Sequence, residues 1–196
     1  MMNEITWAPW TPLELSFQLA GFDYPWAVVG GWALDLWQNA QSRPHEDIEI
    51  TILRPDFDAL RAHLPQCDIF CVKSGEIWPL PENEPAPNDV AQFWCLDRKT
   101  NEFRLDIMIE RGTPRTWVFK RNKWIKRPRA AAQGVGYKGL TYLNPACVLL
   151  FKAKAMRSKD LKDFDAMAPK LTEVDRVWLK EALEVTYSNH PWIKKL

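Results

Sequence analysis

The stretch from residue 24 to residue 53 constrains the fold most, because strand and helix signals alternate there around a pair of glycines. Residues 24–29 form a short apolar run that predicts a buried strand ending at Gly30 and Gly31. WALDLWQNA then repeats apolar residues at helical spacing, and DIEITIL alternates as a strand does. The segment predicts strand, glycine turn, helix, loop and strand.

Acidic side chains share one face of the second of these strands. Successive strand side chains point to opposite faces, so Asp47 and Glu49 lie together while isoleucines pack beneath them. A later strand over residues 102–110 is expected to bury Leu105, Ile107 and Ile109 and to present Arg104, Asp106, Met108 and Glu110 on its polar face. If the two strands are neighbours in register, opposed Cβ atoms lie ~5 Å apart and three carboxylates converge.

Such a group of carboxylates needs a cation, because like charges repel and desolvation favours protonation. All-oxygen ligands suit Mg²⁺, which completes its shell with waters and substrate phosphates, and two ions can serve one phosphate in a two-metal site. The glycine pair adds a second element: residues without Cβ at a helix start let a phosphate approach the free backbone N–H groups. The combination predicts phosphate chemistry.

These motifs resemble the nucleotidyltransferase superfamily related to DNA polymerase β, whose signature is a GG or GS turn, a DxD or DxE strand and a later acidic strand. GGWALDLWQNAQSRPHEDIEI is similar, more narrowly, to the aminoglycoside and lincosamide nucleotidyltransferases and their uncharacterised bacterial relatives. The resemblance continues through RLDIMIE, WVFKRNKWIKRP and YLNPACVLLFKAKAMRSKDLKDFDAMAPKL, so it covers about residues 24–170. Glu49 is one departure, since antibiotic-modifying members commonly carry Asp there. This difference weakens the assignment of the substrate more than the assignment of the reaction.

The resemblance implies an α+β nucleotidyltransferase fold, a mixed β-sheet with flanking helices plus a C-terminal helical part. We expect a catalytic domain over residues 1–140 and a helical region over residues 141–196 packed on it, with a soft boundary. The implied reaction moves a nucleoside monophosphate, usually AMP from ATP, onto an acceptor hydroxyl and releases pyrophosphate. The acceptor would be a small molecule, with an aminoglycoside- or lincosamide-like antibiotic, and hence antibiotic resistance, as one candidate.

The resemblance also implies roles for named residues. Asp47 and Glu49 would ligate Mg²⁺, two ions in all, and Asp106 would complete the metal site and take the proton from the acceptor hydroxyl. Gly30 and Gly31 would cradle the triphosphate. The candidates to neutralise it are Arg43, Lys152, Lys154 and Lys159.

Simpler interpretations stand beside these roles. Asp47 and Glu49 could form an exposed polar strand face, and the two lysines Lys152 and Lys154 could lie on the solvated face of an amphipathic helix. His45 is either a hydrogen-bonding residue behind the acidic pair or an ordinary loop residue. Asp106 and Glu110 could pair with Arg104 or Arg111 as surface ions, and Glu110 is left out of the catalytic set.

The basic residues are distributed unevenly, although the net charge is only +1. No acidic residue occurs between Glu110 and Asp160, yet thirteen of the 26 Lys and Arg residues fall there. We expect this segment to meet an anionic partner. Within it, Trp117, Phe119 and Trp124 alternate with basic residues as on surfaces that stack bases, so an RNA end is the second choice of acceptor.

Two further alternatives concern other acceptors and other classes of protein. The segment 73–90 is predicted to be a long loop, and its acidic residues beside Trp78 could cover a cationic sugar-like molecule, although a solvated loop is the simpler interpretation; these residues are Glu76, Glu82, Glu84 and Asp89. The chain could instead be a non-catalytic nucleotide-binding module, or the nucleotidyltransferase half of a toxin–antitoxin pair that acts on a protein partner.

The remaining signals describe an ordinary globular protein. Helices are predicted over 13–20, 55–64, 145–156, 158–168 and 172–188, strands over 67–72 and 91–96, and a hairpin turning near Asn122. Four cysteines without a CxxC pair argue against zinc and favour buried reduced thiols. No apolar run could span a bilayer, and MMNEITWAPW lacks a signal-peptide pattern, so we expect a cytoplasmic protein that binds no membrane.

Overall fold

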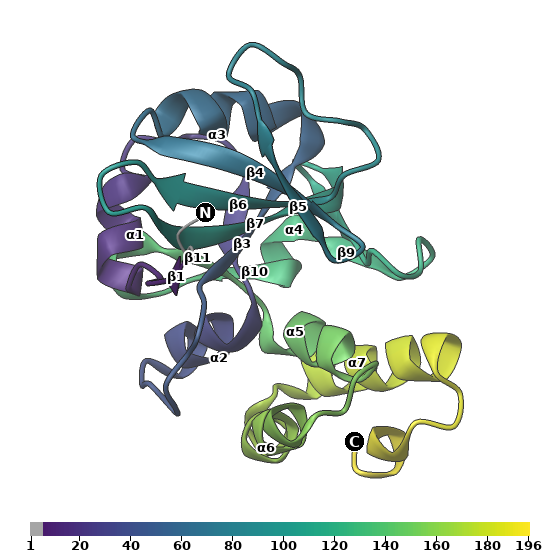
Figure 1. Cartoon of the computed structure of the whole chain (residues 1–196). Coiled ribbons are helices and arrows are strands. Elements are labelled where there is room, and N and C mark those ends of the chain that lie inside the picture. The colour runs from purple at the N-terminus through teal and green to yellow at the C-terminus, as the bar shows by residue number, and fades with distance from the viewer. Residues whose placement is uncertain (1–5) are drawn as a thin grey trace.

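The computed structural model describes residues 6–196; residues 1–5, the start of the segment considered above as a leader, lie outside this range. The larger part of the structure is built around a mixed sheet, and the C-terminal helices gather beside α2 (Figure 1). No helix in the described part of the chain has both the length and the hydropathy needed to cross a membrane.

The first part of the chain follows the predicted order. Its elements are β1 (Thr6–Trp7), α1 (Pro12–Gln18), β2 (Trp26–Val28), α2 (Gly30–Gln38), β3 (Glu49–Leu53), η1 (Arg54–Asp56), α3 (Phe57–His63), β4 (Cys67–Lys73), β5 (Glu76–Leu80), β6 (Gln92–Asp97) and β7 (Glu102–Thr113). Thr11 and Glu14 form a capping box at the start of α1, which satisfies two otherwise unpaired N–H groups. Strand β1 had no sequence signal.

The second part adds a hairpin, two more strands and the helices. These are β8 (Thr116–Val118), β9 (Lys126–Pro128), α4 (Arg129–Ala132), β10 (Gln133–Val135), η2 (Tyr137–Gly139), β11 (Thr141–Leu143), α5 (Pro145–Lys152), α6 (Ser158–Met167), η3 (Ala168–Lys170), α7 (Glu173–Thr186) and η4 (Pro191–Lys194). The three predicted helices are confirmed, although α5 ends four residues before the predicted Met156. Asn144 and Thr172 cap α5 and α7 through their side chains.

The sheet follows the order β10-β11-β2-β3-β7-β6-β4-β5, with β1 and β8 also pairing with β7. Strands β3 and β7 are parallel, whereas β2 and β3 are antiparallel. Strand β11 pairs with β2 and lies beyond residue 140. The sheet therefore continues past the expected boundary, and the division into residues 1–140 and 141–196 stays a prediction.

Two hydrophobic clusters hold these elements together. The first joins the isoleucines of β3 and the inner residues of β7 to α1 and α3. The second joins α5, α6 and α7 to the β8–β9 hairpin. Helix α2 contributes to both, with Leu36 in the first cluster and Ala33 and Leu34 in the second. The glycine turn at the start of α2 is therefore held between two cores.

The prediction of a loop over residues 73–90 is wrong for its first half. Strand β5 pairs antiparallel with β4, and Phe70 is the partner of Pro79. Proline weakens a strand signal because it lacks an N–H, but β5 lies at the end of the sheet order, where proline is tolerated. The rest of the segment is bound to α3, because the Arg61 guanidinium donates to the carbonyls of Pro81 and Glu84.

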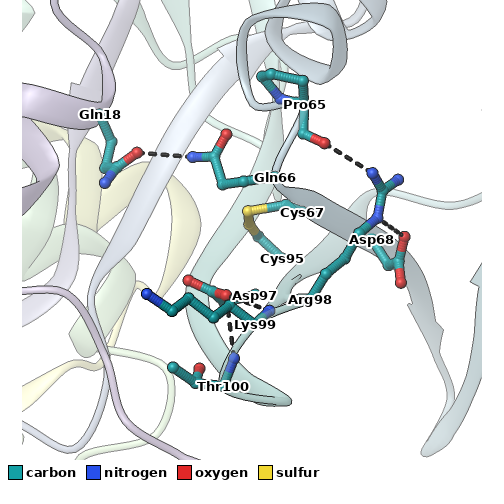
Figure 2. The surroundings of a disulfide bond; sticks show 10 residues. All are labelled: Gln18, Pro65, Gln66, Cys67, Asp68, Cys95, Asp97, Arg98, Lys99 and Thr100. Atoms are coloured by element: carbon teal, nitrogen blue, oxygen red, sulfur yellow. Dashed lines mark hydrogen bonds and ion pairs between the residues drawn. A yellow bond between two sulfur atoms is a disulfide. The ribbon is translucent and has the colours of Figure 1, made fainter.

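Two of the four cysteines are not free thiols. A disulfide joins Cys67 in β4 to Cys95 in β6, with the Cα atoms 5.7 Å apart, a separation usual for disulfides (Figure 2). The expectation of reduced thiols is wrong for this pair, while Cys71 and Cys147 are free and buried. The antiparallel pairing of β4 with β6 brings the two together, which a sequence separation of 28 does not reveal.

The predicted hairpin is confirmed, but its aromatic residues do not form a stacking surface. The chain turns at Asn122, whose N–H donates to the Phe119 carbonyl. Trp117 and Phe119 are fully buried in the second cluster, and only Trp124 is exposed, at 76%. The prediction of a base-stacking surface is wrong for two of its three residues, because the C-terminal helices cover that face of the hairpin.

The hairpin offers a direct test of this packing. We expect Trp117→Ala to lower the free energy of unfolding by about 3–5 kcal/mol, since it leaves a large cavity in the second cluster. Trp124→Ala should change it by less than about 0.5 kcal/mol, because the side chain is exposed. Urea denaturation followed by circular dichroism measures both. Equal destabilisation by the two substitutions would contradict the burial of Trp117.

Candidate functional site

The acidic pair of β3 and β7 lies where the alternation predicted it. Glu49 and Asp106 are direct register partners of parallel strands, and the Asp106 N–H donates to the Ile48 carbonyl at 3.0 Å. Neighbouring strands lie ~4.8 Å apart, so the two carboxyl side chains stand side by side on one face of the sheet. The predicted register is confirmed. The prediction that Asp47 shares the strand face with Glu49 is wrong, because β3 begins at Glu49 and Asp47 lies just before it and is exposed.

The surroundings raise the pKa of both paired carboxyls. Burial raises the pKa of Asp106 to about 7, the charge of Glu49 acts in the same direction, and a hydrogen bond from Gln92 opposes them. Burial also raises the pKa of Glu49 to about 7, with Asp47 adding to the effect. Positive charges limit this rise, with Lys152 the largest contributor. Near neutral pH the pair therefore holds less negative charge than two free carboxylates.

The donor atoms fit a hard divalent cation. The Gln92 amide donates to Asp106 Oδ2 at 2.7 Å, while Asp106 Oδ1 is buried without a hydrogen-bond partner among the described residues. A buried carboxylate oxygen without a partner beside a second carboxylate is an arrangement that Mg²⁺ would compensate. As the side chains of residues 6–196 stand, however, no three His, Cys, Asp or Glu groups are gathered closely enough to hold a metal ion by themselves. Mg²⁺ takes much of its shell from water and phosphate, so two buried carboxylates and a nearby third suit it.

The two glycines make room for the carboxylate site and for its neighbours. Gly30 has φ +66°, and a Cβ there would overlap the Glu49 carboxylate. A Cβ on Gly31 would lie 2.5 Å from His45 Nδ1 and 2.7 Å from Arg43 Nη2. No side chain caps the start of α2, which leaves its first N–H groups available to an anion. The glycine turn thus brings together a helix N-terminus, a carboxylate and an arginine.

His45 is a hydrogen-bonded residue rather than an ordinary loop residue, but its partner is Asp35 of α2 and not Asp47 or Glu49. Its Nε2 lies 2.5 Å from Asp35 Oδ2, and both side chains are only 3% exposed. Asp35 Oδ1 also accepts from the backbone N–H and the hydroxyl of Ser42. Asp35 was missed in the sequence, although a carboxylate on the inner face of an otherwise apolar helix is a usable signal. The contacts of Asp35 hold the loop that leads into β3.

Lys152 is already neutralised by protein carboxylates. Its side chain is buried, with Nζ 3.3 Å from Asp160 Oδ1 and 2.8 Å from Asp163 Oδ2. Arg43 Nη2 lies 3.5 Å from the same Asp163, and Arg157 Nε lies 2.9 Å from Asp160. Three cations meet two carboxylates in this network, which leaves positive charge beside Glu49.

The other predicted cations are placed differently. Lys159 lies 3.7 Å from Glu46, and its charge lowers the pKa of Glu49, as does the charge of Arg157. Lys154 is exposed and forms no ion pair with any residue in the range 6–196, and nothing brings it to the carboxylates. Arg157 was missed, although it lies in the basic segment. Its position at the start of α6 depends on that helix folding back toward β3.

Much of the acid-free segment is structural. Arg129 Nη2 lies 2.6 Å from Glu110, and Arg127 Nη2 lies 2.9 Å from Asp175. Both pairs are largely buried. Glu110 thus belongs to an ion pair, but the predicted surface pairing with Arg104 or Arg111 is wrong, because the partner is the buried Arg129. The expectation of a wholly anion-facing segment is therefore too broad. Lys120 is one member whose charge does reach Asp106.

The acidic residues of the segment 73–90 do not form a cover over the carboxylates. Glu82 pairs with Arg98, and Asp89 lies 2.5 Å from Lys73. Trp78 packs against the first cluster. The loop instead borders a cavity of about 650 Å³ beside α3, whose lining includes Arg61, Arg98 and Glu82. The interpretation of this loop as a cationic-sugar site is not supported by its position.

Known proteins share this fold and part of this sequence. Residues 13–71 match the family model described as Aminoglycoside-2''-adenylyltransferase, a match that includes the glycine turn, Asp47 and Glu49 and ends before Asp106. The crystal structure of ANT(2'')-Ia in complex with adenylyl-2''-tobramycin is similar with a TM-score of 0.59, 14% identity and coverage of 86% of this chain and 92% of that one.

Two other solved structures are also similar. The solution structure of the antibiotic-resistance factor ANT(2'')-Ia has a TM-score of 0.53 and 13% identity, covering 90% of this chain and 91% of that one. The lincomycin-bound lincosamide antibiotic adenylyltransferase LnuA has a TM-score of 0.48 and 16% identity, covering 91% of this chain and all of that one. No curated protein matches the chain.

Proposed function

We propose that this chain, which has the nucleotidyltransferase fold and carries an aminoglycoside adenylyltransferase family domain, is a Mg²⁺-dependent nucleotidyltransferase. It moves AMP from ATP onto a hydroxyl of a small molecule and releases pyrophosphate. The observation that carries the proposal is the register pair of Glu49 and Asp106 beside the turn at Gly30. The adenylylated tobramycin bound to ANT(2'')-Ia supports AMP as the transferred group and a small hydroxyl compound as the acceptor.

The carboxylates take complementary roles in this proposal. Asp47, Glu49 and Asp106 hold Mg²⁺, which neutralises the phosphate charge when it is bound. Asp106 also accepts the proton of the acceptor hydroxyl. Gln92 fixes one Asp106 oxygen, and the other has no hydrogen-bond partner in the described structure and can accept the proton.

The triphosphate is placed over the start of α2. The free N–H groups of its first turn face that position, and Arg43 and Lys159 supply positive charge. Arg157 joins them as a residue that the sequence did not single out. In this proposal Lys152 does not bind phosphate; it neutralises the carboxylates of Asp160 and Asp163. Lys154 remains only a sequence prediction.

The alternatives differ in what supports them. Burial of Trp117 and Phe119 removes the main feature that favoured an RNA end. A protein acceptor, as in a toxin–antitoxin pair, would use the same carboxylates. A non-catalytic nucleotide-binding module would bind ATP without transferring AMP. Whether the acceptor is an antibiotic is part of the proposal that the experiment must decide.

A labelling experiment tests the proposal. ATP labelled in the α-phosphate is offered with Mg²⁺ and, in separate reactions, an aminoglycoside, a lincosamide, an uncharged sugar, tRNA and cell protein. We expect label on a small hydroxyl compound, together with pyrophosphate, and none with Asp47→Asn. Calorimetry with ATP and Mg²⁺ accompanies it. ATP binding that is absent, or that is unchanged by Asp47→Asn, would refute the metal-site assignment, and label on tRNA or protein alone would refute the small acceptor.

A further inference from the structure

An aromatic cluster lies on the sheet face that carries Asp106. The rings of Trp7 and Trp94 are 5.0 Å apart, those of Trp94 and Phe103 are 5.0 Å apart, and Phe70 meets Phe103 at 5.5 Å. None of the four belongs to either of the two large clusters. Trp7, Phe70 and Trp94 are only half-buried. The cluster is therefore a partly open aromatic surface rather than a core.

A β-bulge creates this surface. Cys95 pairs with Leu105 and Leu96 with Phe103, so Arg104 is the extra residue. Simple alternation predicted that Arg104 would stand beside Asp106, and this is wrong. Arg104 lies near Glu14 of α1 instead, and Phe103 turns to Trp94. Because of the bulge, the sheet face that carries Asp106, the proposed base, has the ring of Phe103 where simple alternation had placed the guanidinium of Arg104.

The surface adjoins the carboxylate that we propose as the base. Trp94 is the register partner of Asp106. The Trp94 indole N–H faces the Asp106 carboxyl closely enough to lower its pKa, yet the indole nitrogen and Asp106 Oδ1 are both buried without a well-formed hydrogen bond in the described structure. A hydroxyl satisfies both groups at once, because it accepts from N–H and donates to a carboxylate.

The apolar character extends away from Asp106 along the same face. Val72, two residues beyond Phe70 in β4, is half-buried, and its partner Ile77 in β5 is 47% exposed. If the hydroxyl of an acceptor reaches Asp106, the rest of the acceptor molecule therefore lies against an apolar surface. Such a surface favours a ring system with an apolar face.

The charges around this face do not suit a polycation. Asp68 lies 2.6 Å from Arg98, Glu102 lies 3.1 Å from Arg104, and Glu110 is paired with Arg129. The carboxylates of β4 and β7 near the cluster are thus already matched by arginines, apart from Asp106. Lys120 adds positive charge within range of Asp106. A compound with several ammonium groups would find repulsion and few partners here.

We propose that the acceptor is a hydroxyl compound, uncharged or anionic, that packs an apolar or aromatic ring on the half-buried side chains of Phe70 and Trp94. This inference rests on the proposed function for the role of Asp106, but it concerns binding and can be measured without transfer. It separates this chain from a protein that recognises a polycationic aminoglycoside. The polar partners for its hydroxyl are Asp106 and the Trp94 indole.

Acceptor binding in the absence of ATP tests the proposal. Calorimetry compares a phenyl glycoside, the methyl glycoside of the same sugar and a polyamino sugar, with the full chain as the protein. We expect the phenyl glycoside to bind about tenfold more tightly than the methyl glycoside and the polyamino sugar to bind least, since aromatic stacking adds to apolar burial. A preference for the polyamino sugar, or no preference, would overturn the proposal.

Substitutions in the aromatic cluster test where the ring of the acceptor binds. Phe70→Ala and Trp94→Leu should each weaken binding of the phenyl glycoside about fivefold or more and leave the methyl glycoside nearly unchanged. Trp124→Ala, which removes an exposed tryptophan of the hairpin, is the matched control and should leave both unchanged. Equal binding by all variants would overturn the proposal. Thermal melts establish that each variant is folded, and a failure of AMP transfer despite acceptor binding would count against the proposed function instead.

Discussion

Asp106→Asn is expected to lower the rate of nucleotidyl transfer on the order of a thousandfold, because the amide can neither accept the acceptor proton nor carry charge to Mg²⁺. The side chain keeps its shape and can still accept the Gln92 hydrogen bond. The loss should therefore appear in kcat, while ATP binding weakens less. Pyrophosphate release at saturating ATP measures it. Activity within tenfold of the wild type would exclude Asp106 as the base.

The same substitution should stabilise the protein in the absence of metal. Burial raises the pKa of Asp106 from its usual 3.8 to about 7, so the folded state binds the proton more tightly than the unfolded state. Stability is then lost as pH rises through the window from about 4 to 7. At pH 8 we expect Asp106→Asn to be more stable than the wild type by on the order of 2 kcal/mol, and near pH 3 the difference should vanish.

Urea denaturation at the two pH values, with and without Mg²⁺, tests this linkage. Mg²⁺ should narrow the difference at pH 8, because it binds the ionised carboxylate of the wild type. Asp165→Asn is a suitable control, since Asp165 forms only an exposed ion pair with Lys195 and should change stability by less than about 1 kcal/mol. A variant less stable than the wild type at pH 8 without metal would contradict the buried position of Asp106.

Gly30→Ala is expected to remove most activity by displacing Glu49. Gly30 has φ +66°, which costs an L-residue about 1–2 kcal/mol, and the new Cβ overlaps the Glu49 carboxylate. We expect at least a tenfold loss of Mg²⁺-dependent ATP affinity and roughly a hundredfold loss of transfer, because a misplaced ligand disturbs both binding and geometry. Calorimetry and pyrophosphate release measure the two effects.

Gly21→Ala separates backbone strain from the displacement of Glu49. Gly21 has φ +77°, but a Cβ there meets nothing within 4 Å. Both substitutions should lower stability by a similar amount of about 1 kcal/mol from the backbone alone. Only Gly30→Ala should lose activity. If both variants were equally inactive, general destabilisation would explain the loss and the contact with Glu49 would not.

Several features of this protein are determined by short stretches of sequence. The strand, glycine turn, helix and strand of residues 24–53 were predictable, because apolar periodicity and glycine act within a few residues. The capping of α1 and α7 was predictable for the same reason. The register of Glu49 with Asp106 was also accessible, since one residue of slip would expose the isoleucines of β3.

Other features were decided only when distant segments met. A pattern of alternating aromatic and basic residues is compatible both with a base-stacking surface and with a buried hairpin face. Trp117 is buried because the C-terminal helices pack against the hairpin. Lys152 looks like a phosphate ligand until α6 brings Asp160 and Asp163 to it. The bulge at Arg104, which turns Phe103 toward Trp94, depends on the pairing of β6 with β7. Local preference acts through neighbours in the chain, whereas burial and charge pairing depend on which surface arrives from elsewhere.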